Sequence, residues 1–123
     1  MEKKMSKLHS LPTIIKVGDR TYELFGFLKR DEKNIVGHEM VKRAVEMNAH
    51  CGQDDGQYLL DHQEDIPQNL RGKIYFVFTN WSRPYSFDEV CYIHWKDGRW
   101  VGDWWLTWTG QWDSDGQVLR RIE

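Results

Sequence analysis

The sequence predicts an α+β fold: a twisted antiparallel sheet of five to six strands with two helices packed on one face, in the order ββααββββ. Two observations favour this class. Turn dipeptides between alternating apolar residues, Gly18-Asp19 and Asp97-Gly98, indicate β-hairpins in both halves of the chain. Between these hairpins, residues 35–66 have helical rather than alternating periodicity.

The first expected element is a hairpin within residues 12–28. Its strands flank the turn at Gly18-Asp19, and their apolar residues alternate with polar ones. A two-residue turn sets the register of the strands that it joins. Ile15 is therefore expected to face Tyr22, and Val17 to face Arg20.

A helix is expected over residues 35–51, where apolar residues recur at intervals of three and four. Asn34 suits its N-cap, and Gly52 suits the position after its end. Gly37 weakens the first turn by about 1 kcal/mol. The apolar stripe of this helix consists of Val36, Met40, Ala44, Met47 and Cys51.

A second, shorter helix is expected over residues 54–66. Asp54 with Gln57 three residues later resembles a capping box, and Pro67 ends the helical pattern. The two helical segments hold most of the acidic excess, because residues 31–70 contain nine acidic and three basic residues.

The second half of the chain is predicted to be β structure. Residues 72–80 are rich in β-branched and aromatic residues and form a strand. Residues 81–89 form a loop, and residues 90–108 form a hairpin that turns at Asp97-Gly98. After a further turn, residues 118–122 form the last strand.

The turn at Asp97-Gly98 also predicts where the tryptophans point, because side chains alternate between the two faces of a strand. It pairs Trp95 with Trp100, and Tyr92 with Asp103. One face then carries Cys91, Ile93, Trp95, Trp100, Trp104, Leu106 and Trp108. The opposite face carries Tyr92, His94, Val101, Asp103, Trp105 and Thr107. The first face has no charged residue, so it is predicted to be core beneath the helical stripe.

The second face mixes aromatic and ionisable side chains, a composition that suits either a solvated surface or a recognition patch. Trp105 lies at its centre, and the aromatic loop 81–89 is expected at its rim. We therefore expect a small non-enzymatic binding module whose partner is another protein or a second copy of the chain. The expected binding residues are Trp81, Arg83, Tyr85, Phe87, Tyr92, His94 and Trp105.

Two alternatives remain open from the sequence. In the first, the N-terminal hairpin or the 81–88 loop covers Trp105, so that no binding face exists. In the second, the protein is a small hydrolase-like enzyme in which His94, Asp103 and Tyr92 share one face as an acid–base cluster.

Composition favours no other class of function. The net charge is −2, and the only basic excess lies in residues 1–30, so nucleic acid is an unlikely partner. The spacing of histidine, cysteine and acidic residues is incomplete for a metal site, and we expect no metal or cofactor.

Without a secretion signal or a long apolar stretch, we expect a cytoplasmic protein that does not enter the membrane. We expect a flexible tail over residues 1–10 and one domain over residues 11–123.

Overall fold

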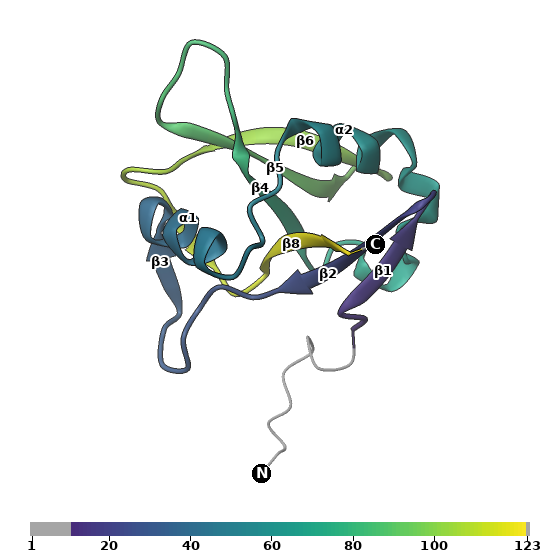
Figure 1. Cartoon of the computed structure of the whole chain (residues 1–123), viewed down its shortest axis with the longest axis horizontal. Helices are drawn as coiled ribbons and strands as arrows, with labels where there is room; N and C mark the ends of the chain where they lie inside the picture. Colours follow the sequence, from purple (N-terminus) through teal and green to yellow (C-terminus); the bar gives the residue numbers. More distant parts are fainter. Residues whose placement is uncertain (1–10, 123) are drawn as a thin grey trace.

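The computed structural model describes residues 11–122 and contains one large and one small β-sheet (Figure 1). The predicted tail, residues 1–10, lies outside the described residues. The elements are β1 (Ile14–Val17), β2 (Arg20–Phe25), β3 (Asn34–Val36), α1 (Gly37–Glu46), α2 (Gln53–Asp61), the 3-10 helices η3 (Gln63–Asp65) and η4 (Gln68–Leu70), β4 (Tyr75–Ser82), β5 (Glu89–Lys96), β6 (Arg99–Leu106), β7 (Gln111–Asp113) and β8 (Gly116–Ile122).

The six strands of the large sheet are ordered β1-β2-β8-β4-β5-β6, which confirms the predicted class, strand number and order of elements. The sheet is mixed rather than wholly antiparallel, because β4 and β8 run parallel over Tyr75–Val77 and Gly116–Val118. Three strands, β5, β6 and β7, separate β4 from β8 in the chain, so no tight turn joins β4 to β8. The chain enters β8 from β7, and β8 therefore runs parallel to β4. The short strands β3 and β7, which pair with each other, were not predicted.

Both predicted hairpin registers are confirmed. Ile15 pairs with Tyr22 and Val17 with Arg20 in the first hairpin. In the second, every pair from Lys96–Arg99 outward to Cys91–Trp104 is as the turn predicts. Asp97 and Gly98 both have positive φ, as a two-residue type I′ turn requires.

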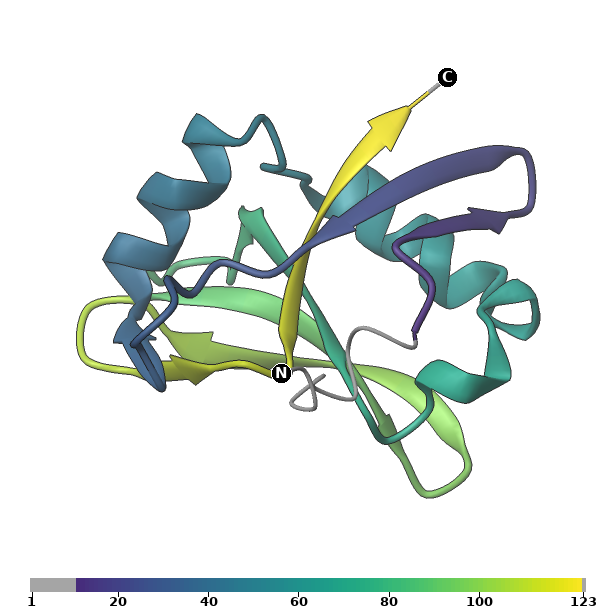
Figure 2. The ribbon, with the colours of Figure 1, turned by 90° about the horizontal axis from the view of Figure 1, so that it is seen from below.

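The helices cover opposite faces of the large sheet, so the prediction that both pack on one face is wrong. Leu59 of α2 packs with Phe76 and Phe78, whereas Met40 of α1 packs with Val77. Successive residues of a strand point to opposite faces, so these two cores lie on either side of β4. Figure 2 shows α1 and α2 on either side of the crossing strands β2 and β8.

The physical reason lies in β4, which is buried on both faces. Phe76, Val77 and Phe78 are all fully buried, and a central strand of this kind needs an apolar layer above and below it. We call the two sides the α1 face and the α2 face. The α2 face includes Ile93 and Trp100, and the α1 face includes Tyr92 and Trp105.

The helix boundaries also differ from the prediction. α1 begins after Val36 rather than Asn34, because Asn34–Val36 pair with β7 as a strand. It ends at Glu46, and Asn48 adopts the left-handed backbone (φ 57°) expected near a helix end. Gly52 precedes α2 as its N-cap instead of ending α1. No side chain of the described residues caps α2, so Asp54 does not form the expected capping box.

The two cysteines are free and buried, and we predict that they are unreactive in the folded protein. Burial raises the pKa of each thiol, Cys51 and Cys91, to about 12. The thiolate is the reactive form, so labelling by 5,5′-dithiobis(2-nitrobenzoate) at pH 8 should be about 100-fold slower in buffer than in 6 M guanidinium. Equal labelling rates in the two solvents would contradict the burial of the thiols.

Candidate functional site

The tryptophans of the second hairpin divide between the two faces largely as predicted. On the α2 face, Trp100 is fully buried and Trp95 and Trp104 are partly buried. On the α1 face, Trp105 is 45% exposed. Trp108 departs from the prediction: it was assigned to the core face but is 63% exposed. β6 ends at Leu106, so the alternation of a strand no longer governs Trp108.

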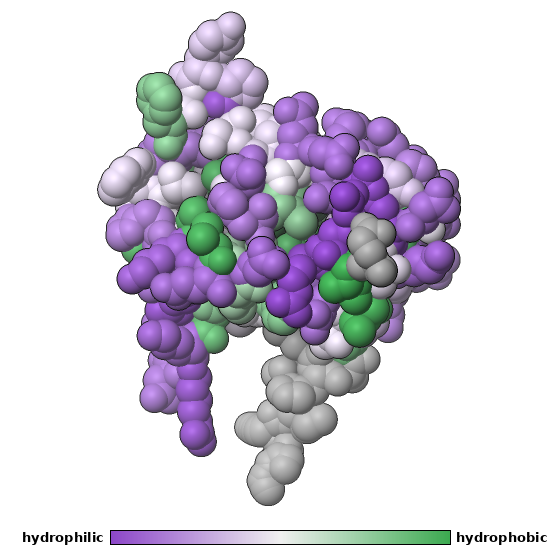
Figure 3. All heavy atoms as spheres, viewed as in Figure 1, coloured by the Kyte–Doolittle hydropathy of each residue, from purple (hydrophilic) through white to green (hydrophobic). Residues whose placement is uncertain are grey.

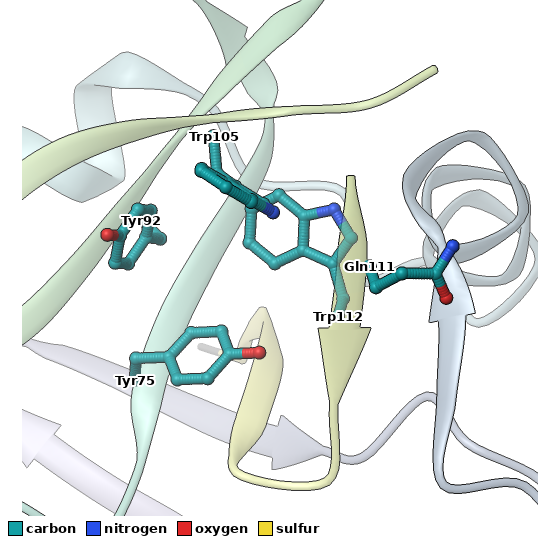
Figure 4. Close-up of a pocket in the computed structure, with 5 residues that line it drawn as sticks. All are labelled: Tyr75, Tyr92, Trp105, Gln111 and Trp112. Atoms are coloured by element: carbon teal, nitrogen blue, oxygen red, sulfur yellow. The ribbon is translucent and has the colours of Figure 1, made fainter. Parts of the chain in front are cut away.

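Trp105 stands at the edge of a hollow of about 260 Å³ on the α1 face, which we call the aromatic pocket (Figure 4). Trp112 is buried, and its ring lies 5.9 Å from that of Tyr92 and 6.1 Å from that of Tyr75. Four strands therefore contribute to one site. The lining residues are Tyr75, Tyr92, Trp105, Gln111 and Trp112.

The segment between β6 and β7 holds the two indoles in place. The Trp112 indole donates a hydrogen bond to the Leu106 carbonyl oxygen at 3.0 Å. Gly110 lies so close to Trp105 that an added Cβ would meet its Nε1 at 2.7 Å. The backbone N–H of Gly37, at the start of α1, donates to the Gly110 carbonyl oxygen at 3.0 Å. The segment that precedes β7 thus lies against one side of Trp105, and the rest of its ring stays partly open to solvent.

Hydrogen bonds tie polar groups to both sides of the aromatic pocket. The Tyr75 hydroxyl donates to Oδ1 of Asp113 at 3.1 Å, and the backbone N–H of Asp113 donates back to that hydroxyl at 3.2 Å. His94 Nε2 lies 3.1 Å from Oδ2 of Asp103. Burial, followed by the charge of Asp103, raises the pKa of the Tyr92 phenol, and burial also raises that of Tyr75. Both phenols therefore stay neutral near pH 7.

The cluster proposed for the hydrolase alternative is only partly assembled. His94 and Asp103 form the close pair just described, and the Tyr92 ring lies 4.9 Å from the His94 ring. However, the aromatic pocket is lined by Tyr92 without His94 or Asp103. Cys91, next to Tyr92 in sequence, points to the α2 face and is not available as a nucleophile there. Among residues 11–122, Tyr92, Asp103 and His94 each line a different hollow, which does not favour the hydrolase alternative.

The loop between β4 and β5 carries the most exposed aromatic side chains. Phe87 is 97% exposed, and Tyr85 is fully exposed. The loop projects from the body of the molecule at the upper left of Figure 1. We call Tyr85, Phe87 and the neighbouring Trp108 the aromatic ridge.

Hydrogen bonds brace the base of this loop. Asp88 Oδ1 accepts from the Trp108 backbone N–H at 2.7 Å and from the Thr107 hydroxyl at 3.2 Å. The Thr107 backbone N–H donates to the Asp88 carbonyl oxygen at 2.8 Å. Arg83 forms an ion pair with Glu89 at 3.3 Å. These contacts fix the ends of the loop against the segment that carries Trp108.

A shallow groove of about 230 Å³ separates the ridge from α1. Its walls include His38 and Val41 of α1 together with Phe87 and Trp108. The rings of His38 and Trp108 lie 5.4 Å apart, and Val45, one turn further along α1, is also exposed. Figure 3 shows hydrophobic residues over α1 and one at the projecting loop, which is otherwise pale.

Trp81 does not belong to the α1 face, although the sequence placed it at the rim of the Trp105 surface. Its ring packs against Phe78 at 6.3 Å and Trp104 at 5.8 Å, beside Gly56 of α2. The β4–β5 register shifts between Phe78 and Ser82, and this irregularity carries the side chain to the other face. Of the other predicted residues, Tyr92 and Trp105 line the pocket, Tyr85 and Phe87 form the ridge, and Arg83 and His94 are paired with acids.

Three lining residues of the aromatic pocket were not predicted from the sequence: Tyr75, Gln111 and Trp112. Tyr75 joins the pocket because β4 is the neighbour of β5 in the sheet, and Trp112 joins it because β7 brings its ring next to Tyr75. Neither placement follows from the local sequence pattern. The one available signal was the alternation of side chains along β4. It predicts that Tyr75 and Val77 lie on the same face of the sheet, but it does not predict which residues Tyr75 contacts there.

A hollow of about 390 Å³ near the end of β8 is lined by a charged network together with His50 and Cys51, and burial raises the pKa of the Cys51 thiol to about 12. Asp55 accepts hydrogen bonds from the Tyr22 hydroxyl at 2.7 Å and from Arg20 at 3.0 Å. Arg120 pairs with Glu23 at 2.7 Å. Burial lowers the pKa of His50, whose Nδ1 lies 2.7 Å from the Thr79 hydroxyl. Structural pairing accounts for these charges.

The structure offers no metal-binding cluster of three histidine, cysteine or acidic side chains within residues 11–122. In the same part of the chain, no helix has the length and apolar character needed to span a membrane. The chain matches no family model, no curated protein and no solved structure.

Proposed function

We propose that this protein is a cytoplasmic, non-enzymatic interaction module that binds a partner protein through the aromatic ridge and the neighbouring Trp105. The observation that carries this proposal is the backbone of Tyr85, which has a φ of 64° although its side chain is fully exposed. An aromatic residue seldom adopts this left-handed conformation, which costs about 1–2 kcal/mol.

The turn at Tyr85 would be more stable with glycine. The Ser86 backbone N–H donates to the Arg83 carbonyl oxygen at 3.0 Å, which closes a four-residue turn over Pro84 and Tyr85. Turns with proline second and a positive φ third normally place glycine or asparagine at the third position. A tyrosine there destabilises the turn and supplies no buried contact, so its role is best sought on the surface.

The ridge has the composition and rigidity of a binding surface. Of the six large apolar side chains exposed within residues 11–122, four are aromatic: Tyr85, Phe87, Trp105 and Trp108. Tryptophan and tyrosine are enriched among the residues that dominate binding energy. Because Asp88 holds the loop against Trp108, less conformational entropy is lost when a partner binds.

The shape of the ridge favours a different protein over a second copy. A symmetric homodimer requires a surface that is complementary to itself. A projecting loop instead requires a concave partner, and a stable interface of standard size buries about 1,200–2,000 Å² in total. The groove between the ridge and α1 extends the surface available to such a partner.

Site-specific photocrosslinking tests the proposal. A photoreactive phenylalanine at position 87 should give one discrete protein adduct in cells that produce the protein. The same group at Gln57, which is exposed on α2, serves as the matched control. Adducts of equal yield at both positions, or none at position 87, would contradict the proposal. An adduct of twice the protein's mass would identify a second copy as the partner.

Tyr85→Gly separates binding from folding in this proposal. The substitution removes the strain at φ 64°, so urea denaturation should show equal or higher stability, by up to about 1 kcal/mol. Affinity for the crosslinked partner, measured by calorimetry with purified proteins, should fall by about tenfold or more. A variant that binds as tightly as the wild type would remove Tyr85 from the binding surface.

A further inference from the structure

The aromatic pocket is a slot with one separate wall. Tyr75, Tyr92 and Trp112 contact one another, with the Tyr75 and Tyr92 ring centroids 5.7 Å apart. Trp105 lines the same hollow but stacks on no other ring within residues 11–122. The hollow that Trp105 shares with the three-ring cluster has a volume of about 260 Å³, which is enough for a flat side-chain group between the Trp105 indole and the cluster.

Two carboxylates lie on residues next to those that line this slot, although neither carboxylate lines the hollow itself. Asp103 lies directly opposite Tyr92 in the sheet and two residues before Trp105, on the same face. Asp113 follows Trp112 and is hydrogen-bonded to Tyr75. Within residues 11–122, neither carboxylate forms a salt bridge with a lysine or an arginine.

Each of these carboxylates also keeps one oxygen without a partner among the described residues. Oδ2 of Asp103 pairs with His94, which leaves Oδ1. Oδ1 of Asp113 accepts from Tyr75 and from the Asp115 backbone N–H, which leaves Oδ2. The Tyr92 hydroxyl likewise has no hydrogen-bond partner in this part of the chain. The surface beside the slot therefore presents acceptors and negative charge.

We propose that the aromatic pocket receives the guanidinium group of an arginine side chain from the partner protein. A cation is attracted to the faces of tryptophan and tyrosine, and a planar guanidinium stacks on them while its N–H groups remain free to donate. Asp103 and Asp113 supply the acceptors that these donors require. A quaternary ammonium group would fill the slot but has no N–H group to donate to the remaining oxygen of either carboxylate.

This inference rests on the proposed function, because the arginine belongs to the same partner that meets the ridge. The pocket nevertheless binds its guanidinium by its own side chains, so a small arginine derivative can test it without the partner. The ridge residue Phe87 takes no part in the pocket, which makes Phe87→Ser a variant that impairs the ridge alone.

The test is a titration of the protein with N-acetyl-arginine methylamide, followed by the indole N–H resonances in proton–nitrogen NMR spectra. N-acetyl-citrulline methylamide is the matched neutral probe, because it keeps the planar shape and loses the charge. The arginine probe should shift the Trp105 resonance in a saturable manner, and the citrulline probe should bind at least about fivefold more weakly. Trp105→Leu should abolish the response, and Asp113→Asn should weaken it about threefold.

Three results would overturn the assignment of arginine. The first is equal binding of the arginine and citrulline probes, and the second is tighter binding of tetramethylammonium than of the arginine probe. The third is a response that persists in Trp105→Leu. Phe87→Ser should bind the arginine probe normally while it loses the crosslinked partner. Loss of partner binding without loss of probe binding in Phe87→Ser would show that the ridge and the pocket act separately. The failure of the proposed ridge function can thus be distinguished from the failure of the proposed arginine site.

Discussion

Trp100→Ala should lower the free energy of unfolding by about 3–5 kcal/mol, whereas Trp105→Ala should lower it by about 1 kcal/mol. Trp100 is fully buried on the α2 face, with its ring 5.2 Å from Phe76 and 5.7 Å from Trp95. Truncation of this ring leaves a cavity that close-packed neighbours fill only in part. A domain of this size has a total stability of only about 5–15 kcal/mol, so Trp100→Ala should be close to unfolding.

Urea denaturation followed by far-ultraviolet circular dichroism measures both losses without relying on tryptophan emission. Trp100→Phe is an informative companion, because the buried Nε1 of Trp100 has no hydrogen-bond partner among residues 11–122 and phenylalanine removes that group. It should lose clearly less stability than Trp100→Ala. Equal, large losses in Trp100→Ala and Trp105→Ala would show that the α1 face is as well covered as the α2 face, and the aromatic pocket would lose its open wall.

The part of the fold that sequence could predict is local. Asp97-Gly98 and Gly18-Asp19 determine their hairpins, because a two-residue turn sets every pair in the strands that it joins. The opposite orientations of Trp100 and Trp105 follow from that register alone. The prediction fails for Trp108, two residues beyond the end of β6, where no strand partner maintains the alternation.

The side of the sheet on which α1 packs was not predictable in the same way. Its apolar stripe fits either face, and the run Phe76-Val77-Phe78 supplies apolar surface to both. The choice depends on the position of β8 between β2 and β4, which in turn depends on contacts between residues more than 40 positions apart. Periodicity within one segment contains no information about such contacts.

The candidate site shows the same division. Tyr92, Trp105, Tyr85 and Phe87 were predicted because their placement follows from strand alternation or from the composition of a loop. Trp81 was misplaced because the irregular pairing between Phe78 and Ser82 reverses its side, and a register shift leaves no mark in composition. Trp112 was missed because β7 pairs with β3, a strand that had been assigned to a helix.

Gly37→Ala should lower the free energy of unfolding by about 2–3 kcal/mol, although its helical position alone predicts a gain of about 1 kcal/mol. Gly37 is the first residue of α1, and its backbone N–H is bonded to Gly110. An added Cβ would lie 2.5 Å from the Cα of Thr107 and 2.8 Å from Nε1 of Trp112. Because backbone surrounds the site, α1 must move as a whole to admit the methyl group.

Gly102→Ala, in β6, is the matched control. Its Cβ would meet Cys91 Sγ at 3.6 Å and Leu60 Cδ1 at 3.8 Å, which are ordinary contacts, so stability should stay unchanged or rise by about 0.5 kcal/mol. Urea denaturation of both variants measures the difference, and a stabilised Gly37→Ala would contradict the close approach of α1 to residues 107–112.

Gly37→Ala should also alter the aromatic pocket, because displacement of Trp112 moves the ring cluster that faces Trp105. Gly37→Ala should therefore weaken binding of the arginine probe at temperatures where the variant is still folded, and Gly102→Ala should leave that binding intact.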